Sequence, residues 1–258
     1  MTLAHSPETT NPEDIVWSLP EQSTADTALL VLPHAGGNAH AYAEWRDHLP
    51  AGVRLLIGQY PGRGARFADP LPLSVDDLAG PVVDSIPDGI PNLVVLGHSM
   101  GSLVAFEVAR RLTARGTPPR ALIASAARAP HLPNQAPVHP ELLDDDALVA
   151  AIKARGGTQD GILDEPELRE IVLPAIRADF AIDDAYQHTG PTGLTCPITV
   201  IGGTEDPIVP VDVLGTWATA TSSAVAVETL PGDHFYFQQQ LPRFLALVTA
   251  VIDAATRP

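Results

Sequence analysis

The sequence predicts an α/β fold, in which a mostly parallel β-sheet is flanked by helices on both faces. Two observations lead to this prediction. Short apolar runs, each about the length of a strand that is buried on both faces, end at Gly or Pro residues. Between them lie segments whose apolar residues recur three and four positions apart, as on one face of a helix. This alternation favours parallel strands joined by right-handed crossovers.

The apolar runs are the predicted strands of this sheet, and they span residues 28–32, 53–57, 93–96, 121–124, 198–201 and 225–230. After the third run, a helical pattern begins near Ser102, and Gly116 offers a stop. Ser74 followed by Asp77 resembles an N-terminal capping box and predicts the start of another helix. The active sites of such sheets lie at the carboxyl ends of the strands.

Residues 131–190 interrupt this alternation, because they contain no strand pattern. Two helical faces are expected there, one with Leu148, Val149 and Ile152, the other with Leu168, Ile171, Val172, Ala175 and Ile176. We predict that residues 131–190 form a helical lid over the strand ends. A single long crossover is the alternative, but its length exceeds that of usual connections. Residues 15–130 and 191–258 then form the core, and residues 1–14 form a flexible tail.

The composition excludes several function classes. The chain has 31 acidic and 15 basic residues and a formal net charge of −16, which argues against nucleic acid and anionic membranes as partners. No apolar stretch approaches the roughly 20 residues that span a bilayer. The single cysteine, Cys196, excludes an intrachain disulfide, and the first 27 residues lack the pattern of a signal peptide. These features suit a cytoplasmic protein, and we also expect it to be a monomer.

The strongest motif is Gly97-His98-Ser99-Met100-Gly101, which matches G-x-S-x-G. It follows the predicted strand 93–96 and precedes a predicted helix, which is the context that a nucleophile elbow requires. Such a turn lifts the serine hydroxyl above the sheet, and the helix behind it contributes free N–H groups. The motif predicts an α/β-hydrolase fold with Ser99 as the catalytic nucleophile.

A serine hydroxyl needs a base to remove its proton, and the base needs a group to orient it. His234 follows the last predicted strand, and Asp206 follows the strand 198–201. The order serine, acid, histidine is that of α/β-hydrolases. Glu205 and Asp233 are alternatives for the acid, but Asp233 is adjacent to His234 and badly placed to reach its ring. We therefore predict a Ser99–His234–Asp206 triad.

Attack on a carbonyl creates an oxyanion, which needs two preorganised donors. We assign the backbone N–H of Met100, the residue after the nucleophile, and that of Ala35. Ala35 lies in the loop after the strand 28–32, where Gly36 and Gly37 allow a close approach of the backbone. We expect no metal or cofactor. Five of the other histidines show no metal-ligand spacing with His or Cys residues; these are His40, His48, His131, His139 and His188.

Together, these motifs resemble those of type II thioesterases, the discrete editing enzymes of polyketide and nonribosomal peptide synthesis. The resemblance extends over residues 15–255. It rests on the segments 33–37 (Pro-His-Ala-Gly-Gly), 59–64 (Gln-Tyr-Pro-Gly-Arg-Gly), 97–101, 155–157 (Arg-Gly-Gly), 173–180 (Leu-Pro-Ala-Ile-Arg-Ala-Asp-Phe), 202–206 (Gly-Gly-Thr-Glu-Asp) and 231–235 (Pro-Gly-Asp-His-Phe). The residues by themselves indicate only acyl transfer to water at an activated serine.

The resemblance implies a thioester substrate, an acyl group on the phosphopantetheine arm of an acyl or peptidyl carrier protein. The enzyme would remove such groups from stalled modules. Carrier proteins are commonly acidic, as is this chain, so we expect a weak and transient encounter. One hypothesis is that Arg63, Arg66, Arg128 and Arg177 form a local positive mouth for docking; the alternative is that they are ordinary salt-bridged arginines.

Two other functions are compatible with parts of the sequence. A carboxylesterase or a macrocycle-forming thioesterase would use the same three residues. A non-catalytic, hydrolase-like protein would only bind a ligand under the lid. The second alternative is disfavoured, because nucleophile, acid, base and both donor loops are all present.

Overall fold

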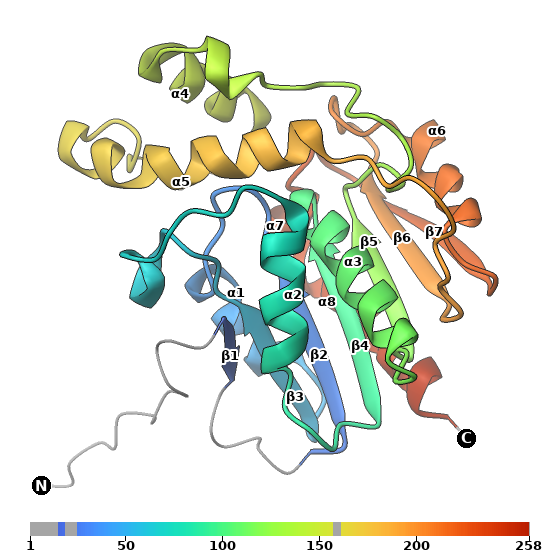
Figure 1. The fold of residues 1–258 in the computed structure, drawn as a ribbon. Helices are drawn as coiled ribbons and strands as arrows, with labels where there is room; N and C mark the ends of the chain where they lie inside the picture. Colours follow the sequence, from blue (N-terminus) through green and yellow to red (C-terminus); the bar gives the residue numbers. More distant parts are fainter. Residues whose placement is uncertain (1–14, 19–24, 157–160, 258) are drawn as a thin grey trace, which may run out of the picture.

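The computed structural model describes residues 15–18, 25–156 and 161–257, so the predicted tail, residues 1–14, lies outside the described residues. A seven-stranded sheet has the order β1-β3-β2-β4-β5-β6-β7 (Figure 1). All neighbouring strands are parallel except β1 and β3. The strands are β1 (Val16–Ser18), β2 (Thr27–Leu32), β3 (Val53–Gly58), β4 (Asn92–His98), β5 (Ala121–Ser125), β6 (Ile198–Gly203) and β7 (Val225–Leu230).

The helices are α1 (His40–Ala43), α2 (Val75–Ser85), α3 (Met100–Ala114), α4 (Asp145–Arg155), α5 (Pro166–Ala185), α6 (Val211–Leu214), α7 (Tyr236–Gln239) and α8 (Leu241–Thr256). Ser74 caps α2, because its side chain accepts a hydrogen bond from the N–H of Asp77. Among the described residues, no helix combines the length and the hydropathy that a membrane crossing requires.

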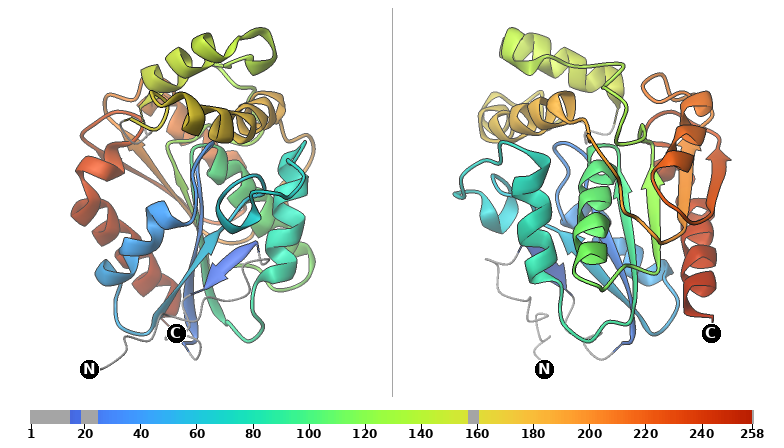
Figure 2. Two further views of the ribbon diagram at one scale, coloured as in Figure 1. Left: turned by 90° about the vertical axis from the view of Figure 1, so that its left-hand side faces the viewer. Right: turned by 45° about the vertical axis from the view of Figure 1, so that its right-hand side comes forward.

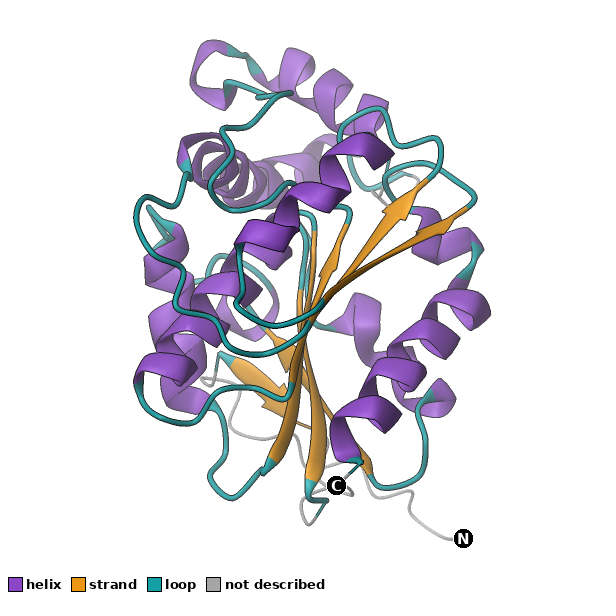
Figure 3. Ribbon diagram, turned by 90° about the vertical axis from the view of Figure 1, so that its right-hand side faces the viewer, coloured by secondary structure: helices purple, strands orange, loops and turns teal. Residues whose placement is uncertain are grey.

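Strands β2 to β6 are buried on both faces, as their continuous apolar runs predict, whereas the edge strand β7 is mostly exposed, contrary to the expectation from its apolar run. Alternate side chains of β2 enter two different clusters: Leu30 and Leu32 pack with α2 and α3, whereas Leu29 and Val31 pack with α1 and α8. The helices accordingly cover opposite faces of the sheet (Figures 2 and 3). All six predicted strands are confirmed. The edge strand β1 was not predicted, because its three residues are too few to show a period.

Helices α4 and α5 lie across the carboxyl ends of the strands (Figure 1). Their facing side chains, among them Leu148, Ile152 and Ile176, form a hydrophobic cluster separate from the two that flank the sheet. The expected apolar face of α5 is partly wrong, because Leu168 and Ile171 are 44% and 48% exposed. The first turns of α5 extend sideways beyond α2, so this part of the helix has no core beneath it (Figure 1).

Candidate active site

Ser99 lies at the bend between β4 and α3, where the backbone is strained. Its φ of 55° and ψ of −126° are unfavourable for a residue with a side chain. The N–H of Ser99 donates to the carbonyl of Ser125 at 2.8 Å, which holds the bend in place. A Cβ on Gly97 would lie 2.1 Å from the carbonyl oxygen of Gly101, so only glycine fits this position.

Gly101 brings the start of α3 against the loop after β2. A Cβ at this position would lie 2.1 Å from the carbonyl oxygen of Leu32 and 2.5 Å from that of Pro33. Backbone atoms cannot move away as the end of a flexible side chain can. Gly101 therefore sets the distance between the nucleophile elbow and residues 33–37, which we call the oxyanion loop.

We expect Gly101→Ala to lower the free energy of unfolding by about 3 kcal/mol or more, through overpacking. Gly80→Ala is the matched control, because Gly80 is also helical and, apart from its chain neighbours, its added Cβ meets only the Arg111 side chain at 3.9 Å. This control should change the stability little, because the helix propensity gained with alanine is opposed by crowding against Pro81, which follows it in the helix. Urea denaturation measures both changes. Equal midpoints for the two variants would contradict the close backbone approach at Gly101.

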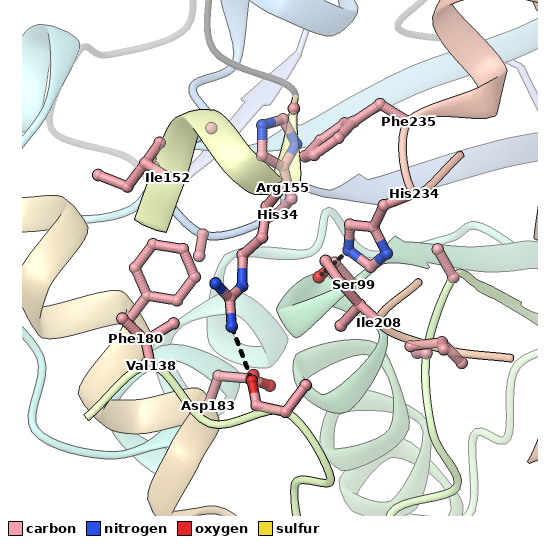
Figure 4. Close-up of a pocket in the computed structure, with 18 of the residues that line it drawn as sticks. His34, Ser99, Val138, Ile152, Arg155, Phe180, Asp183, Ile208, His234 and Phe235 are labelled. Carbon is pink, nitrogen blue, oxygen red and sulfur yellow. Dashed lines mark hydrogen bonds between the residues drawn. The ribbon is translucent and has the colours of Figure 1, made fainter. Parts of the chain in front are cut away.

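Two hydrogen bonds join the three predicted triad residues through His234, and Figure 4 shows the side chains of Ser99 and His234 facing each other. Nδ1 of His234 lies 2.8 Å from Oδ2 of Asp206, and Nε2 lies 2.9 Å from Oγ of Ser99. A carboxylate only accepts, so the proton of the neutral ring lies on Nδ1 and leaves Nε2 to accept from the Ser99 hydroxyl. Asp206 and His234 are both buried.

The other oxygen of Asp206 is occupied, and this holds the carboxylate in place. Its Oδ1 accepts hydrogen bonds from the N–H groups of Ile208 at 2.8 Å and Val209 at 3.0 Å. The alternative acids are placed elsewhere: Glu205 is exposed, and the side chain of Asp233 accepts from the N–H of Phe235.

The loop that carries Asp206 and the loop that carries His234 are bonded directly to each other. The N–H of Thr204 donates to Leu230 and that of Glu205 to Gly232, both at 2.9 Å. A Cβ on Gly203 would lie 2.3 Å from the carbonyl oxygen of Asp233. Gly203 therefore permits the contact that fixes the relative position of acid and base, a role that sequence reasoning missed.

The oxyanion loop forms a tight turn closed by a hydrogen bond of 2.9 Å from the N–H of Gly37 to the carbonyl of His34. Gly36, at the third position of the turn, has a φ of +77°, as a type II turn requires. The N–H of Gly36 donates to Asp179 at 2.7 Å, whereas that of Ala35 has no acceptor among the described residues. Met100 is the first residue of α3, where N–H groups lack an intrahelical partner. Both N–H groups assigned from the sequence are therefore free to donate hydrogen bonds to an oxyanion.

Two further imidazoles, those of His34 and His98, pack beside the triad. Nδ1 of His34 lies 2.7 Å from the hydroxyl of Tyr42, and Nδ1 of His98 lies 2.8 Å from Oγ of Ser125. Burial, with a smaller contribution from His234, lowers the pKa of His34 from 6.5 to about 3. Burial also lowers the pKa of His98 well below 6.5. Both rings are therefore neutral at pH 7.

These two histidines predict acid sensitivity of the fold. The folded protein resists protonating them, whereas the unfolded chain accepts the protons near pH 6.5, so their contribution to stability is complete above pH 6.5 and is lost toward pH 3. We expect His34 to lower the free energy of unfolding by about 1–2 kcal/mol between pH 7 and pH 5, and His98 to act in the same direction. His34→Gln should reduce this difference. The exposed control His40→Gln should not, and equal pH slopes for the two variants would argue against the neutral state of His34.

A cavity of about 730 Å³ opens beside Ser99 and His234. Ser99 and His234 lie on one side, and an apolar wall with Val138, Ile152 and Phe180 lies on the other (Figure 4). This wall comes from the segment that contains α4 and α5. The volume and the lining suit a small, largely apolar ligand with a polar reacting end.

The hypothesis of a docking mouth is wrong for Arg63 and Arg128, because their side chains are only 9% and 10% exposed. All four arginines are paired with carboxylates, in the pairs Arg63–Asp179, Arg66–Asp69, Arg128–Asp183 and Arg177–Asp145. The alternative of salt-bridged arginines describes them better.

Comparisons with known proteins find relatives along most of the chain. A family model described as a thioesterase domain matches residues 27–252. Thioesterase PikA5 of Streptomyces venezuelae is 39% identical over 215 residues, which cover 82% of this chain and 76% of PikA5. The gramicidin S biosynthesis protein GrsT of Aneurinibacillus migulanus is 33% identical over 220 residues, with 84% and 85% covered.

Two solved structures are similar over most of their length. RedJ, a thioesterase from the prodiginine pathway of Streptomyces coelicolor, has a TM-score of 0.81 at 33% identity, covering 89% of this chain and 92% of RedJ. YbtT, a type II thioesterase from the yersiniabactin pathway, has a TM-score of 0.81 at 29% identity, covering 94% of this chain and 100% of YbtT.

Proposed function

Because the chain belongs to the thioesterase family and is thus a hydrolase of thioester bonds, we propose that Ser99, His234 and Asp206 are its catalytic triad. The observation that supports this most is the pair of hydrogen bonds that joins the three side chains, at 2.9 and 2.8 Å. Covalent labelling of Ser99 by a fluorophosphonate tests the assignment. An unlabelled Ser99 would instead favour the non-catalytic, ligand-binding alternative.

The proposed reaction proceeds through an acyl-enzyme. Oγ of Ser99 attacks the thioester carbonyl carbon while Nε2 of His234 takes the hydroxyl proton. The N–H groups of Ala35 and Met100 donate to the oxyanion, and Asp206 stabilises the imidazolium. The thiol leaves with the proton from His234. Water, activated by the same histidine, then attacks the acyl-enzyme and releases the acid.

We propose that the thioester is an acyl group on the phosphopantetheine arm of an acyl or peptidyl carrier protein, and that the enzyme edits stalled polyketide or nonribosomal peptide synthases. The likeness to PikA5, GrsT and YbtT supports this assignment, since YbtT is a type II thioesterase from an NRPS/PKS pathway. Residues 131–190 would serve as the lid, and the apolar cavity beneath it would hold the acyl chain. The protein would act as a cytoplasmic monomer. Its charge of −16 disfavours long-range attraction to an acidic carrier.

A hydrolysis panel separates carrier editing from general ester hydrolysis. The same series of acyl chains is presented on a carrier protein, on free N-acetylcysteamine and as p-nitrophenyl esters. We expect the highest kcat/KM on the carrier, because contacts remote from the reacting carbonyl contribute to transition-state binding. A preference for the p-nitrophenyl ester at every chain length would favour the carboxylesterase alternative, and a cyclic product from long substrates would favour a cyclising thioesterase.

A further inference from the structure

We propose that Asp179, on helix α5, is a positioning residue that sets the conformation of the oxyanion loop. Helix α5 would then be part of the catalytic apparatus as well as a wall of the cavity. This inference rests on the proposed function, because it assumes that the loop carries an oxyanion donor at Ala35. It also gives Arg63 a different role from the docking role expected from the sequence, since Arg63 forms an ion pair with Asp179 inside the site.

The first observation is a direct bond between the helix and the loop. Oδ2 of Asp179 accepts a hydrogen bond of 2.7 Å from the N–H of Gly36, across 143 positions of sequence. The side chain of Asp179 is completely buried. In a turn of this kind, the central peptide faces one way in type II and the opposite way in type I. A carboxylate oxygen on this side accepts the N–H only in the type II orientation, so Asp179 selects it.

The second observation is that the same carboxylate is held by an arginine that also contacts the loop. Nη1 and Nη2 of Arg63 donate to the two oxygens of Asp179 at 2.5 and 2.8 Å. Nη1 also donates to the carbonyl of Gly37 at 3.3 Å. Asp179 therefore accepts from the N–H of Gly36 while Arg63 donates to the carbonyl of Gly37. One N–H and one carbonyl of the loop thus have a buried, charged partner.

The third observation is packing from the same face of α5. A Cβ on Gly36 would lie 3.0 Å from Cγ1 of Ile176, which precedes Asp179 by about one helical turn. Gln59 extends the support, because its amide oxygen accepts from Ala39 and its amide nitrogen donates to the carbonyl of Arg63. The loop is therefore enclosed between α5 and the residues that follow β3.

Such support has a catalytic consequence, because oxyanion donors work by being oriented before the charge develops. Gly36 has a positive φ and can adopt many backbone conformations, so the sequence of the loop alone does not maintain one of them. A buried ion pair gains little net stability over apolar side chains of the same size. The pair acts here by making directional hydrogen bonds to the loop, since an apolar pair cannot accept from the N–H of Gly36 or donate to the carbonyl of Gly37.

The test compares catalysis with transition-state binding in Asp179→Asn and Asp179→Ala. On an acyl-N-acetylcysteamine substrate, we expect kcat to fall roughly 10- to 100-fold with little change in KM, and Asp179→Ala to be the slower variant. The second readout is a trifluoromethyl ketone with the same acyl chain. The hydroxyl of Ser99 adds to its carbonyl carbon to form a hemiketal, and the hemiketal oxygen accepts from the same oxyanion donors. The affinity for this ketone should fall by the same factor as kcat/KM.

Glu107→Gln is the matched control. Glu107 is a buried carboxylate on α3 that accepts from the hydroxyl of Tyr186, just after α5, and from Arg110, but it has no bond to the oxyanion loop. In this variant, the affinity for the ketone relative to the KM of the thioester substrate should be the same as in the wild-type enzyme. An equal loss of ketone affinity in Glu107→Gln would reduce Asp179 to a merely structural residue and overturn the proposal.

The double variant Arg63→Met/Asp179→Leu covers the case in which single variants fail to fold, since it replaces the whole pair by apolar side chains. A folded double variant with low kcat and weak ketone binding supports the positioning role, and one with wild-type kcat overturns it. Wild-type rates in Asp179→Ala, which removes the acceptor of the Gly36 N–H, would also overturn it. A wild-type enzyme that cleaves free thioesters but no acyl-carrier would refute carrier editing and leave this inference intact.

Discussion

Replacing Ser99 with alanine should lower kcat by about 10⁴–10⁶-fold, because no acyl-enzyme can then form. Oγ of Ser99 is the atom that Nε2 of His234 contacts at 2.9 Å, and alanine at this position removes only that atom. The fold should remain, since the N–H of residue 99 still donates to Ser125 and the strained φ of 55° is equally demanding for both side chains. KM should change little.

The measurement is steady-state hydrolysis of an acyl-N-acetylcysteamine thioester, together with mass spectrometry for an acyl adduct. Ser74→Ala is a suitable control, because it makes the same chemical change at the N-cap of α2. That variant should lose about 1 kcal/mol of stability and no activity. If Ser99→Ala retained a tenth of the wild-type rate, another nucleophile would have to be sought.

Replacing His234 with alanine should cost a similar factor, about 10⁴–10⁶ in kcat, because the Ser99 hydroxyl then has no base. Since the two residues act as a unit, the double variant Ser99→Ala/His234→Ala should be no slower than either single variant. Additive losses would indicate that the two side chains contribute separately and would contradict a shared proton transfer.

Asp206→Ala should be less damaging than His234→Ala, because Asp206 acts on the ring and not on the substrate. Glu205→Ala is its neighbour control, with an exposed side chain that should be replaceable without effect. A silent Asp206→Ala combined with a severe loss in Glu205→Ala would show that the acid has been assigned to the wrong residue.

The sequence predicts the strands and the order of the site residues well because both depend on local patterns. An apolar run followed by glycine or proline reports a buried strand and its end. Ser99, Asp206 and His234 each follow such a run, and parallel strands bring their carboxyl ends to one edge. A single long-range assumption, that these parallel strands belong to one sheet, is therefore enough to predict that the three side chains lie close together.

Other features depend on tertiary contacts that no local pattern encodes. The helical spacing of Leu168 and Ile171 predicts burial, yet these residues lie on a part of α5 that has no core beneath it. Arg63 and Asp179 are 116 positions apart, and each taken alone resembles an ordinary surface charge. A family motif marked both segments, but it did not reveal that the two side chains meet.

The apolar wall opposite Ser99 is contributed by one continuous stretch of chain, from Val138 to Phe180, whereas the triad comes from three separate loops. Under the proposed function, we expect this stretch to contribute to acyl-chain preference. We expect a chimera that exchanges this stretch between homologues, by gene conversion or in the laboratory, to shift chain-length selectivity toward that of the donor. The exchange is constrained at Ile176 and Asp179, because these two positions also support the host's oxyanion loop.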